Sequence, residues 1–150
     1  MQADVRATDD PAEAAGCDVV STVTAATQPV LKGEWLQPGC HLNLVGVHTP
    51  TAREADTAAI TRSRVYVDLM ESALNEAGDL LVPIGEGAID ERHILGEIGQ
   101  VLAGAVPGRT DESDITLYKS LGIVAQDLFA AAHIYARAAD EGAGVEVDLD

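Results

Sequence analysis

The stretch His41-Leu-Asn-Leu-Val-Gly-Val-His-Thr-Pro-Thr-Ala-Arg-Glu-Ala-Asp56 decides the fold class of this 150-residue chain. The apolar segment Cys40–Val45 predicts a buried β-strand, and a glycine-containing loop follows it. Thr51-Ala-Arg-Glu54 fits a capping box, which predicts a helix over about residues 52–62. In open α/β sheets, ligands bind just beyond the carboxyl ends of strands, so this loop is where we expect a ligand.

Other apolar runs extend the strand pattern along the chain. β-Branched and apolar residues predict strands over residues 18–23, 65–68 and 115–118. Shorter extended segments are expected over residues 3–7 and 80–84.

Helix patterns lie between these runs. Asp10 and Pro11 form a typical helix start, and that short helix is expected to close near Gly16. Further helices are expected over residues 70–77 and 90–103, and a last one from Ser120 onward. Because strands that alternate with helices are typical of parallel sheets, the sequence predicts an α/β fold.

The last helix carries an amphipathic pattern. Its apolar residues advance by three or four positions, which predicts one buried stripe: Leu121, Val124, Leu128, Ala131 and Tyr135. A helix of this length exceeds what a small sheet needs, so we expect it to pack against another domain or subunit. The acidic, glycine-rich tail over residues 141–150 is expected to fray, which leaves residues 1–140 as the folded domain.

The composition is strongly acidic, with 25 Asp and Glu against 9 Lys and Arg and a formal net charge of −16. This charge repels nucleic-acid phosphates and anionic lipids, so we expect neither as a partner. Scarce lysine and abundant alanine fit a cytoplasm at high salt or, alternatively, an ordinary acidic protein from a GC-rich genome. No apolar run approaches the ~20 residues of a membrane span, and the start Met1–Arg6 has no apolar signal region, so we expect a cytoplasmic protein.

The sequence offers no pattern for a metal site. Cys17 and Cys40 border apolar strands and are interpreted as small buried hydrophobes without a disulfide. No Cys-x-x-Cys or His-x-x-x-His spacing supports zinc. The loop Asp111–Asp114 lacks the spacing and glycine of a calcium-binding loop, and we interpret it as solvated.

Several motifs in order along the chain resemble one family. They are Asp18-Val-Val-Ser-Thr-Val-Thr24, Leu31-Lys-Gly-Glu-Trp-Leu-Gln-Pro-Gly39, the His41–Asp56 stretch, Glu76-Ala-Gly-Asp-Leu80, Ala103-Gly-Ala-Val-Pro-Gly-Arg109 and Asp114-Ile-Thr-Leu-Tyr-Lys-Ser-Leu-Gly122. From about Ala3 to Arg137 the chain resembles the ornithine cyclodeaminase/mu-crystallin family of NAD(P)-dependent enzymes. The resemblance implies a partial Rossmann-type parallel sheet with flanking helices and a long C-terminal helix.

Family members are about twice this long, and the resemblance covers their C-terminal half. The chain has no Gly-x-Gly-x-x-Gly phosphate loop. The resemblance implies that this loop, the acid that reads the ribose and the basic residues that hold the substrate carboxylate lie upstream. It also implies NAD or NADP as cofactor, a small-molecule substrate, and a homodimer or a need for a complementary chain.

The resemblance assigns roles to residues beyond the strand ends. Those expected to contact the cofactor are Thr24, Val45, Gly46, Val47, His48 and Ser120, and Leu121 is expected on the substrate side. Hydroxyls and backbone groups suit this task because they can orient a nicotinamide ring, and glycine permits close approach.

His48 marks a departure within the family. In cyclodeaminases proper, an aspartate at this position serves deamination and ring closure. The form found here looks more like members that reduce cyclic imines such as Δ1-pyrroline-2-carboxylate to amino acids. The alternatives are an ornithine cyclodeaminase or alanine dehydrogenase type of activity, a non-catalytic ligand-binding module, or an inactive fragment.

Each of three side chains, His48, Ser120 and Lys119, has two possible roles. His48 is a candidate proton donor or a pocket-lining residue, since histidine exchanges protons near neutral pH. Ser120 contacts the cofactor, caps the last helix, or does both. Lys119 either attracts a carboxylate or phosphate or forms a surface salt bridge. The other histidines are expected to be structural or solvated, and residues 53–54 are assigned to the capping box.

Overall fold

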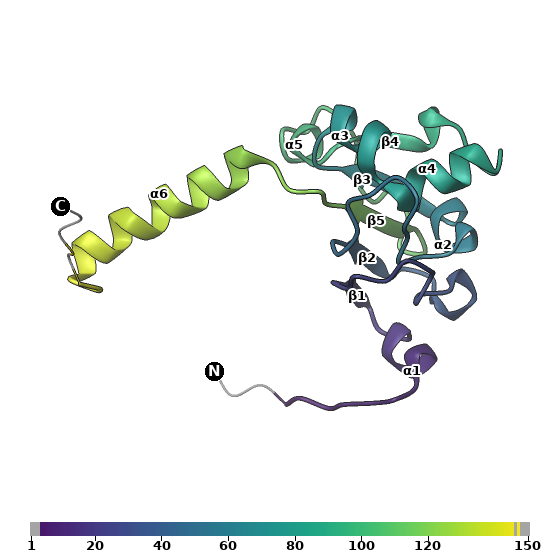
Figure 1. Ribbon diagram of the computed structural model, residues 1–150, viewed down its shortest axis with the longest axis horizontal. Helices are drawn as coiled ribbons and strands as arrows, with labels where there is room; N and C mark the ends of the chain where they lie inside the picture. Colours follow the sequence, from purple (N-terminus) through teal and green to yellow (C-terminus); the bar gives the residue numbers. More distant parts are fainter. Residues whose placement is uncertain (1–3, 146, 148–150) are drawn as a thin grey trace.

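The computed structural model, which describes residues 4–145 and 147, has a five-stranded sheet at its centre (Figure 1). All strand pairs are parallel, and the spatial order is β1-β2-β5-β3-β4. The strands are β1 (Val19–Thr22), β2 (His41–Leu44), β3 (Ser63–Val67), β4 (Ile94–Glu97) and β5 (Ile115–Lys119). The expected parallel α/β sheet is therefore confirmed.

One face of the sheet carries the apolar core. Leu42, Leu44 and Leu117 are fully buried on it, next to Ile60 and Leu80 from helices. The elements that pack there are η1 (Gly33–Trp35), α2 (Thr57–Thr61), α3 (Met70–Glu76) and α4 (Gly78–Gly85). Because side chains alternate along a strand, the intervening residues face the other side of the sheet.

The connection from β4 back to β5 covers part of that second face. It contains α5 (Ile98–Leu102) and the loop over residues 103–114. The Tyr66 hydroxyl oxygen lies 2.8 Å from the Pro107 carbonyl oxygen and 2.9 Å from that of Gly108, and its single proton is donated to this pair, which fixes the loop over β3. β4 precedes β5 in the chain but lies two places beyond it in the sheet, so a right-handed crossover must run on the face opposite α2 and α4.

The helix expected over residues 52–62 is shorter than the sequence pattern suggests. α2 begins at Thr57, and its N-cap is Asp56, whose Oδ1 accepts from the Ala59 amide at 2.8 Å. The capping box at Thr51–Glu54 does not form, because the Glu54 carboxylate turns into the protein. Arg53 instead pairs with Glu86 of the α4 C-cap at 3.3 Å.

The segment expected to be extended over residues 80–84 is helical. Ala77, Leu80 and Pro83 are all buried, and their three-residue spacing fits a helix that lies against the core. The prediction was wrong because a short apolar run has no clear period of its own.

The expected helix over residues 90–103 is also wrong. Asp90 caps only a 3₁₀ turn, η2 (Glu91–His93), by accepting from the Arg92 amide at 2.9 Å. β4 and α5 follow, and β4 pairs with β3. Pairing with a strand distant in the sequence overrides the local helix pattern here.

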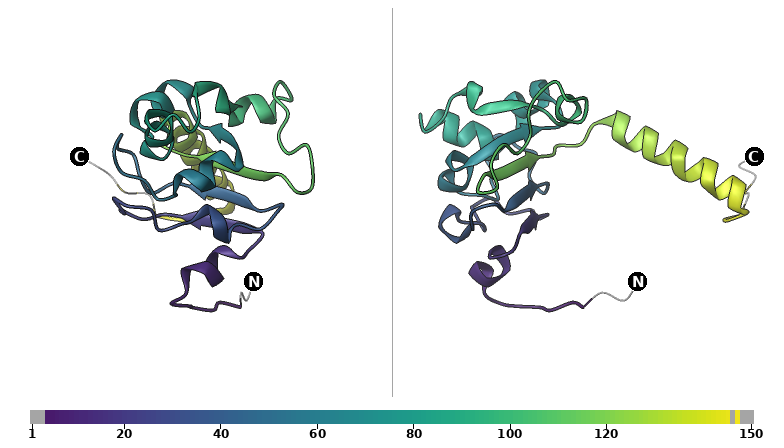
Figure 2. Two further views of the ribbon diagram at one scale, coloured as in Figure 1. Left: turned by 90° about the vertical axis from the view of Figure 1, so that its right-hand side faces the viewer. Right: turned by 180° about the vertical axis from the view of Figure 1, so that it is seen from behind.

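The residues before α1 and the whole of α6 lie outside this body (Figures 1 and 2), whereas Ala15 at the end of α1 is buried in the core. α1 (Pro11–Ala15) starts at Asp10 as expected, whereas residues 4–7 form no strand and Ala3 lies outside the described residues. α6 (Val124–Glu141) extends away from the sheet, and none of its residues is buried. Of the expected buried stripe, Val124, Leu128, Ala131 and Tyr135 are therefore exposed in the single chain, whereas Leu121, which precedes α6, is half-buried against the core. Of the tail over residues 141–150, residues 146 and 148–150 lie outside the described residues.

The last helix begins at Val124, not at Ser120. Gly122 adopts a φ of 86°, and the Asp68 carboxylate holds the amides of Leu121 and Gly122. Both features keep the segment between β5 and α6 out of helical geometry.

Both cysteines are free; Cys40 is buried as expected, but Cys17 is exposed. Burial raises the pKa of the Cys40 thiol, although Arg109 and Arg62 oppose this effect. None of the helices described here is both long and apolar enough to cross a membrane.

Candidate functional site

The carboxyl ends of four neighbouring strands meet at one edge of the sheet. The Val45 amide donates to the Thr22 carbonyl at 3.0 Å, and the Ser120 amide donates to the Leu44 carbonyl at 3.0 Å. The Asp68 amide, which follows β3, donates to the Lys119 carbonyl at 3.3 Å. The segments after β1, β2, β5 and β3 therefore lie next to one another.

This edge gathers the residues to which the resemblance assigns roles. Thr24, Val45 and His48 are exposed there, and Gly46, Ser120 and Leu121 are half-buried. Val47 is the exception, because its side chain is only 4% exposed and belongs to the core side of the loop. The edge thus presents two hydroxyls, an imidazole and loop backbone to solvent.

Glu54 ties the ends of β1 and β2 together from inside. Its carboxylate is fully buried and accepts hydrogen bonds from Thr22 Oγ1 (2.8 Å), the Thr24 amide (2.6 Å) and the Gly46 amide (2.8 Å). Burial alone raises the pKa of Glu54, but the hydrogen bonds from Thr24, Thr22 and Gly46 outweigh it, so this pKa lies below its ordinary value. The ionised carboxylate fixes where the loop leaves each strand.

Gly46 allows this close arrangement. A Cβ at this position would overlap the backbone nitrogen and oxygen of Thr24 and lie 2.6 Å from Glu54 Oε1. The close approach that the glycine permits is therefore made by the chain's own Thr24 segment.

Asp68 organises the turn after β5. Its Oδ2 accepts from the amides of Leu121 (2.6 Å) and Gly122 (2.7 Å) and lies 3.4 Å from the Ser120 hydroxyl. Its Oδ1 accepts from the Leu69 amide at 2.9 Å. Ser120 is consequently held by Asp68 and does not cap the last helix.

Lys119 has neither of the roles expected for it. It is fully buried, its Nζ donates to the Val47 carbonyl at 2.6 Å, and the same nitrogen lies 3.2 Å from Asp79 Oδ2. Oδ2 has no hydrogen-bond partner among the described residues, so the contact with Lys119 is an ion pair without hydrogen-bond geometry. A lysine in this position does not reach solvent in this chain.

Sequence reasoning missed the carboxylates of Glu54, Asp68 and Asp79 as parts of this edge. Asp68 offered a usable signal, because an acid directly after a buried strand stands at the strand's carboxyl end. Glu54 was hidden by its fit to a capping box. Asp79 lies at the start of α4 and gave no signal of its own.

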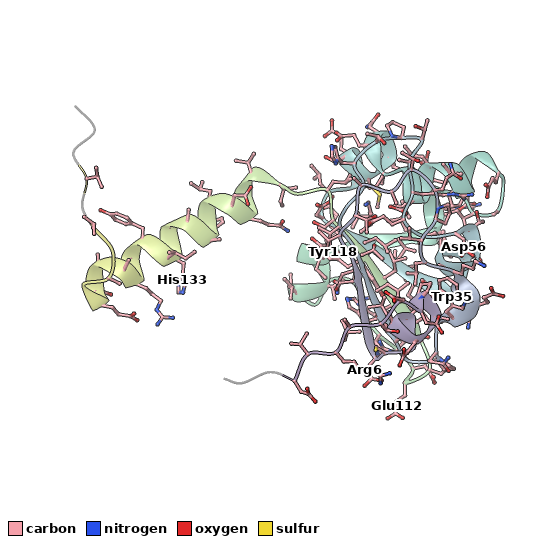
Figure 3. The ribbon with its side chains drawn as sticks, turned by 60° about the horizontal axis from the view of Figure 1, so that its bottom comes forward. Arg6, Trp35, Asp56, Glu112, Tyr118 and His133 are labelled. Atoms are coloured by element: carbon pink, nitrogen blue, oxygen red, sulfur yellow. The ribbon has the colours of Figure 1, made fainter. Side chains whose placement is uncertain are left out.

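The remaining histidines have other surroundings. His41 Nδ1 lies 2.7 Å from Thr116 Oγ1, and His93 Nε2 lies 2.9 Å from the Ile60 carbonyl. His133 is exposed on α6, away from the sheet (Figure 3). Within residues 4–145 and 147, no His, Cys, Asp and Glu side chains are grouped as metal ligands.

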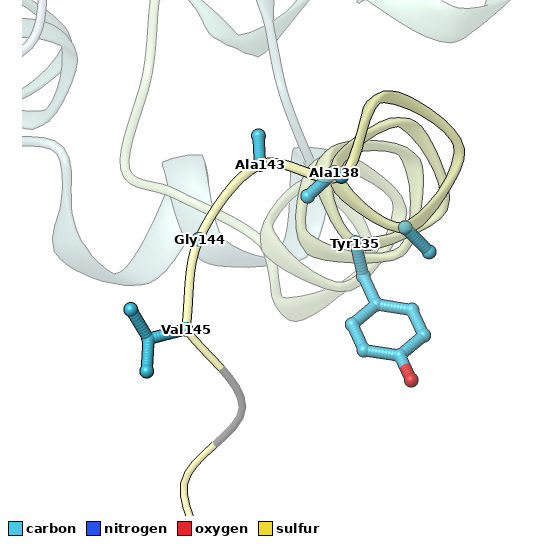
Figure 4. A pocket seen from close by; sticks show the side chains of 7 residues that line it. Tyr135, Ala138, Ala143, Gly144 and Val145 are labelled. Carbon is cyan, nitrogen blue, oxygen red and sulfur yellow. The ribbon is translucent and has the colours of Figure 1, made fainter.

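An open hollow of about 470 Å³ lies at the far end of α6, where the chain turns back after Gly142 (Figure 4). Alanine, glycine and valine residues line it together with Tyr135. It lies far from the strand ends and has no charged side chain in its lining, so the strand ends are the stronger candidate site.

The chain is similar to known proteins over most of its length. The mouse (Mus musculus) ketimine reductase mu-crystallin is 43% identical over 136 residues, which cover 90% of this chain and 41% of that protein. The Bacillus cereus Δ1-pyrroline-2-carboxylate reductase is 40% identical over 142 residues, which cover 93% of this chain and 43% of the reductase. The chain thus spans about two fifths of the length of these relatives.

Solved structures are similar to the chain as well. The Thermococcus litoralis Δ1-pyrroline-2-carboxylate reductase, solved with NADH and L-proline, matches with a TM-score of 0.83 and 38% identity over 91% of this chain and 42% of that chain. An archaeal alanine dehydrogenase dimer with bound NAD matches with a TM-score of 0.81 and 31% identity, over 95% of this chain and 44% of that one. The sheet described here is part of a Rossmann-type sheet. The model of the ornithine cyclodeaminase/mu-crystallin family matches residues 1–142, and the chain belongs to that family.

Proposed function

We propose that this chain forms the nicotinamide side of the active site of an NAD(P)-dependent reductase. Its substrate is a small cyclic imine of the Δ1-pyrroline-2-carboxylate type, and its product is the corresponding cyclic amino acid. One observation carries the proposal: Thr24, the loop over residues 45–48 and Ser120 meet at one sheet edge, in a chain 38% identical to a reductase solved with NADH and L-proline.

The residues at this edge suit the nicotinamide end of the cofactor. Thr24 and Ser120 offer hydroxyls, and the loop around Gly46 offers backbone groups that Glu54 already holds in place. When bound, the cofactor supplies the hydride that reduces the imine carbon. The pyrophosphate needs a different cradle, because the chain has no Gly-x-Gly-x-x-Gly loop. We assign that cradle to the part of the relatives that this chain does not match.

His48 is the proposed proton donor. Reduction of a C=N bond adds a hydride to carbon and needs a proton on nitrogen. His48 is exposed at the end of the loop, and histidine is the side chain that most often transfers protons in general acid–base catalysis. Leu121, half-buried beside Ser120, supplies apolar contact for the carbon ring of the substrate.

An amino-acid dehydrogenase activity is the second candidate. The alanine dehydrogenase is 31% identical to this chain and covers it almost entirely. Both candidates use hydride transfer, but the dehydrogenase acts on an open-chain substrate. His48 stands where cyclodeaminases proper are expected to have an aspartate, so ornithine cyclisation is disfavoured.

A chimera tests the reaction directly. This chain would replace the matching segment of the Bacillus cereus reductase, to which it is 40% identical. We expect oxidation of NADH or NADPH with Δ1-pyrroline-2-carboxylate, and less with pyruvate plus ammonium. A folded chimera that binds the cofactor but turns over only pyruvate, only ornithine or nothing would contradict the proposal.

Variants of two histidines test the proton donor in the same chimera. We expect His48→Ala to lower kcat by about a hundredfold or more, with cofactor affinity largely unchanged. His133→Ala is the matched control, since His133 is exposed on α6 away from the sheet. Equal kcat values for the two variants would remove the role from His48.

The working protein is proposed to be a homodimer or to include a complementary chain. The alanine dehydrogenase with a TM-score of 0.81 is a dimer, and α6 of this chain exposes an apolar stripe. The net charge of −16 disfavours nucleic acid and anionic membranes as partners. Sedimentation velocity over a range of concentrations checks the self-association.

A further inference from the structure

A buried ion pair lies directly beneath the loop that carries His48. Lys119 and Asp79 are both 0% exposed, and Lys119 Nζ lies 3.2 Å from Asp79 Oδ2. Burying two charges is costly because both lose their hydration, and well-packed apolar residues often give equal or greater stability. Stability alone therefore does not account for a lysine and an aspartate at these positions.

The pair holds both ends of one segment. Lys119 Nζ donates to the Val47 carbonyl at 2.6 Å, just before His48. Asp79 Oδ1 accepts from the amides of Glu54 (2.7 Å) and Ala55 (3.0 Å), where the same segment ends. The Lys119–Asp79 pair therefore contacts the loop over residues 47–55 at both of its ends.

The pair also connects this loop to the second half of the site. Lys119 is the last residue of β5, and Ser120 and Leu121 follow it directly. Its backbone carbonyl accepts from the Asp68 amide at 3.3 Å, and Asp68 holds the turn over residues 120–122. A movement of the Lys119 side chain would change the position of His48 relative to Ser120.

We propose that Lys119 and Asp79 are positioning residues that set the place of the Val47 carbonyl, and with it of His48, relative to the Ser120–Leu121 turn. The inference rests on the proposed function for its catalytic consequence. Neither side chain reaches solvent, so neither contacts substrate. Their effect passes through the loop backbone alone.

A double variant tests whether the pair positions the loop, without leaving one buried charge unpaired. Lys119→Met with Asp79→Asn removes both charges, and the amide oxygen of Asn can still accept from Glu54 and Ala55. Arg137→Met with Glu141→Gln is the matched control, because that pair is exposed on α6. The readout in the 150-residue chain is exchange of the Gly46 amide, which neither altered side chain contacts, measured with urea unfolding of the same proteins.

We expect the Gly46 amide to exchange about tenfold faster or more in the double variant, with the urea midpoint and the Val65 amide unchanged. In the chimeric reductase, the same variant should lower kcat by about tenfold to a hundredfold with little change in KM. Unchanged Gly46 exchange at an unchanged midpoint overturns the inference, and so does faster exchange with normal kcat. An inactive wild-type chimera refutes the proposed function instead, while the exchange result still decides whether the pair positions the loop.

A second measurement needs no variant. The chain has only two lysines, Lys119 and Lys32, and the Lys32 side chain is 54% exposed. In the chain labelled with ¹⁵N-lysine, we expect slow hydrogen exchange at the Lys119 ammonium and fast exchange at that of Lys32. Fast exchange at both ammonium groups overturns the inference even if the double variant does not fold.

Discussion

The sheet with the helices packed on it, called the body here, and α6 differ in which side chains they bury and which they expose. In the body, Glu54, Asp79 and Lys119 are fully buried, each with a partner from a distant part of the chain. On α6, Val124 and Tyr135 are 82% and 78% exposed. Charged residues are seldom buried, and exposed apolar patches commonly mark interaction surfaces. The body therefore supplies the partners of its own buried charged residues, whereas the apolar side chains of α6 are exposed.

The largest effect is expected from the core of the body. Leu117 is fully buried in β5, and Leu117→Ala should lower the free energy of unfolding by about 3 kcal/mol. Leu102→Ala at the end of α5 is the control, since Leu102 is 83% exposed and should change it by less than about 0.5 kcal/mol. Urea denaturation measures both. Similar losses would mean that the sheet is not the stabilising core.

A smaller loss is expected at the loop after β2. Gly46→Ala should cost about 2 to 3 kcal/mol, because the new methyl group overlaps the Thr24 backbone and crowds Glu54. Gly99→Ala in α5 meets nothing within 4 Å and should be neutral or stabilising by up to about 1 kcal/mol. If both variants unfold at the wild-type urea midpoint, the packing of Thr24 against Gly46 is wrong.

Glu54 makes the stability of the body depend on pH. Glu54→Gln should cost about 2 kcal/mol at neutral pH, because the amide cannot accept all the hydrogen bonds that the carboxylate accepts. The folded pKa of Glu54 lies below its ordinary value of 4.5, so its contribution is present above that pH and is lost as pH falls through the folded value.

Urea denaturation from neutral pH into the acid range checks this. The stability gap between wild type and Glu54→Gln should close as the pH drops below about 4. Glu112→Gln is the control, because Glu112 is exposed and its side chain should contribute little at any pH. A gap that stays constant down to acid unfolding would show that ionisation of Glu54 does not stabilise the fold.

The same contrast explains what the sequence could and could not predict. β1, β2, β3 and β5 are rich in β-branched and apolar residues, and each was predicted close to its observed place. β4 was missed because its identity comes from pairing with β3 and not from its own pattern. Long-range contacts decide such cases, and local propensity is too weak to oppose them.

Only part of the candidate site could be predicted from the sequence, for a related reason. The family resemblance supplied Thr24, the loop over residues 45–48 and Ser120, which the fold brings to one edge. The supporting network was not predicted, since Glu54 lies 30 residues from Thr24, and Lys119 lies 72 residues from Val47. Local rules instead assigned Glu54 to a helix start, and Lys119 to a ligand or to the surface. A charge next to a strand end can equally be solvated or buried, and only the tertiary fold distinguishes the two.

The smallest effect is expected on α6. Leu128 is 65% exposed in the single chain, so Leu128→Ala should change the free energy of unfolding by less than about 0.5 kcal/mol at low protein concentration. Alanine is also a good helix former, which removes any penalty from propensity. The informative comparison is with Leu117→Ala, because the two substitutions delete the same atoms from the two regions. If Leu128→Ala costs about 2 kcal/mol or more, and the loss grows with protein concentration, then α6 is packed against a second copy of the chain. A large loss that does not vary with concentration would mean that α6 folds back on its own sheet, and the contrast between the two regions would not hold.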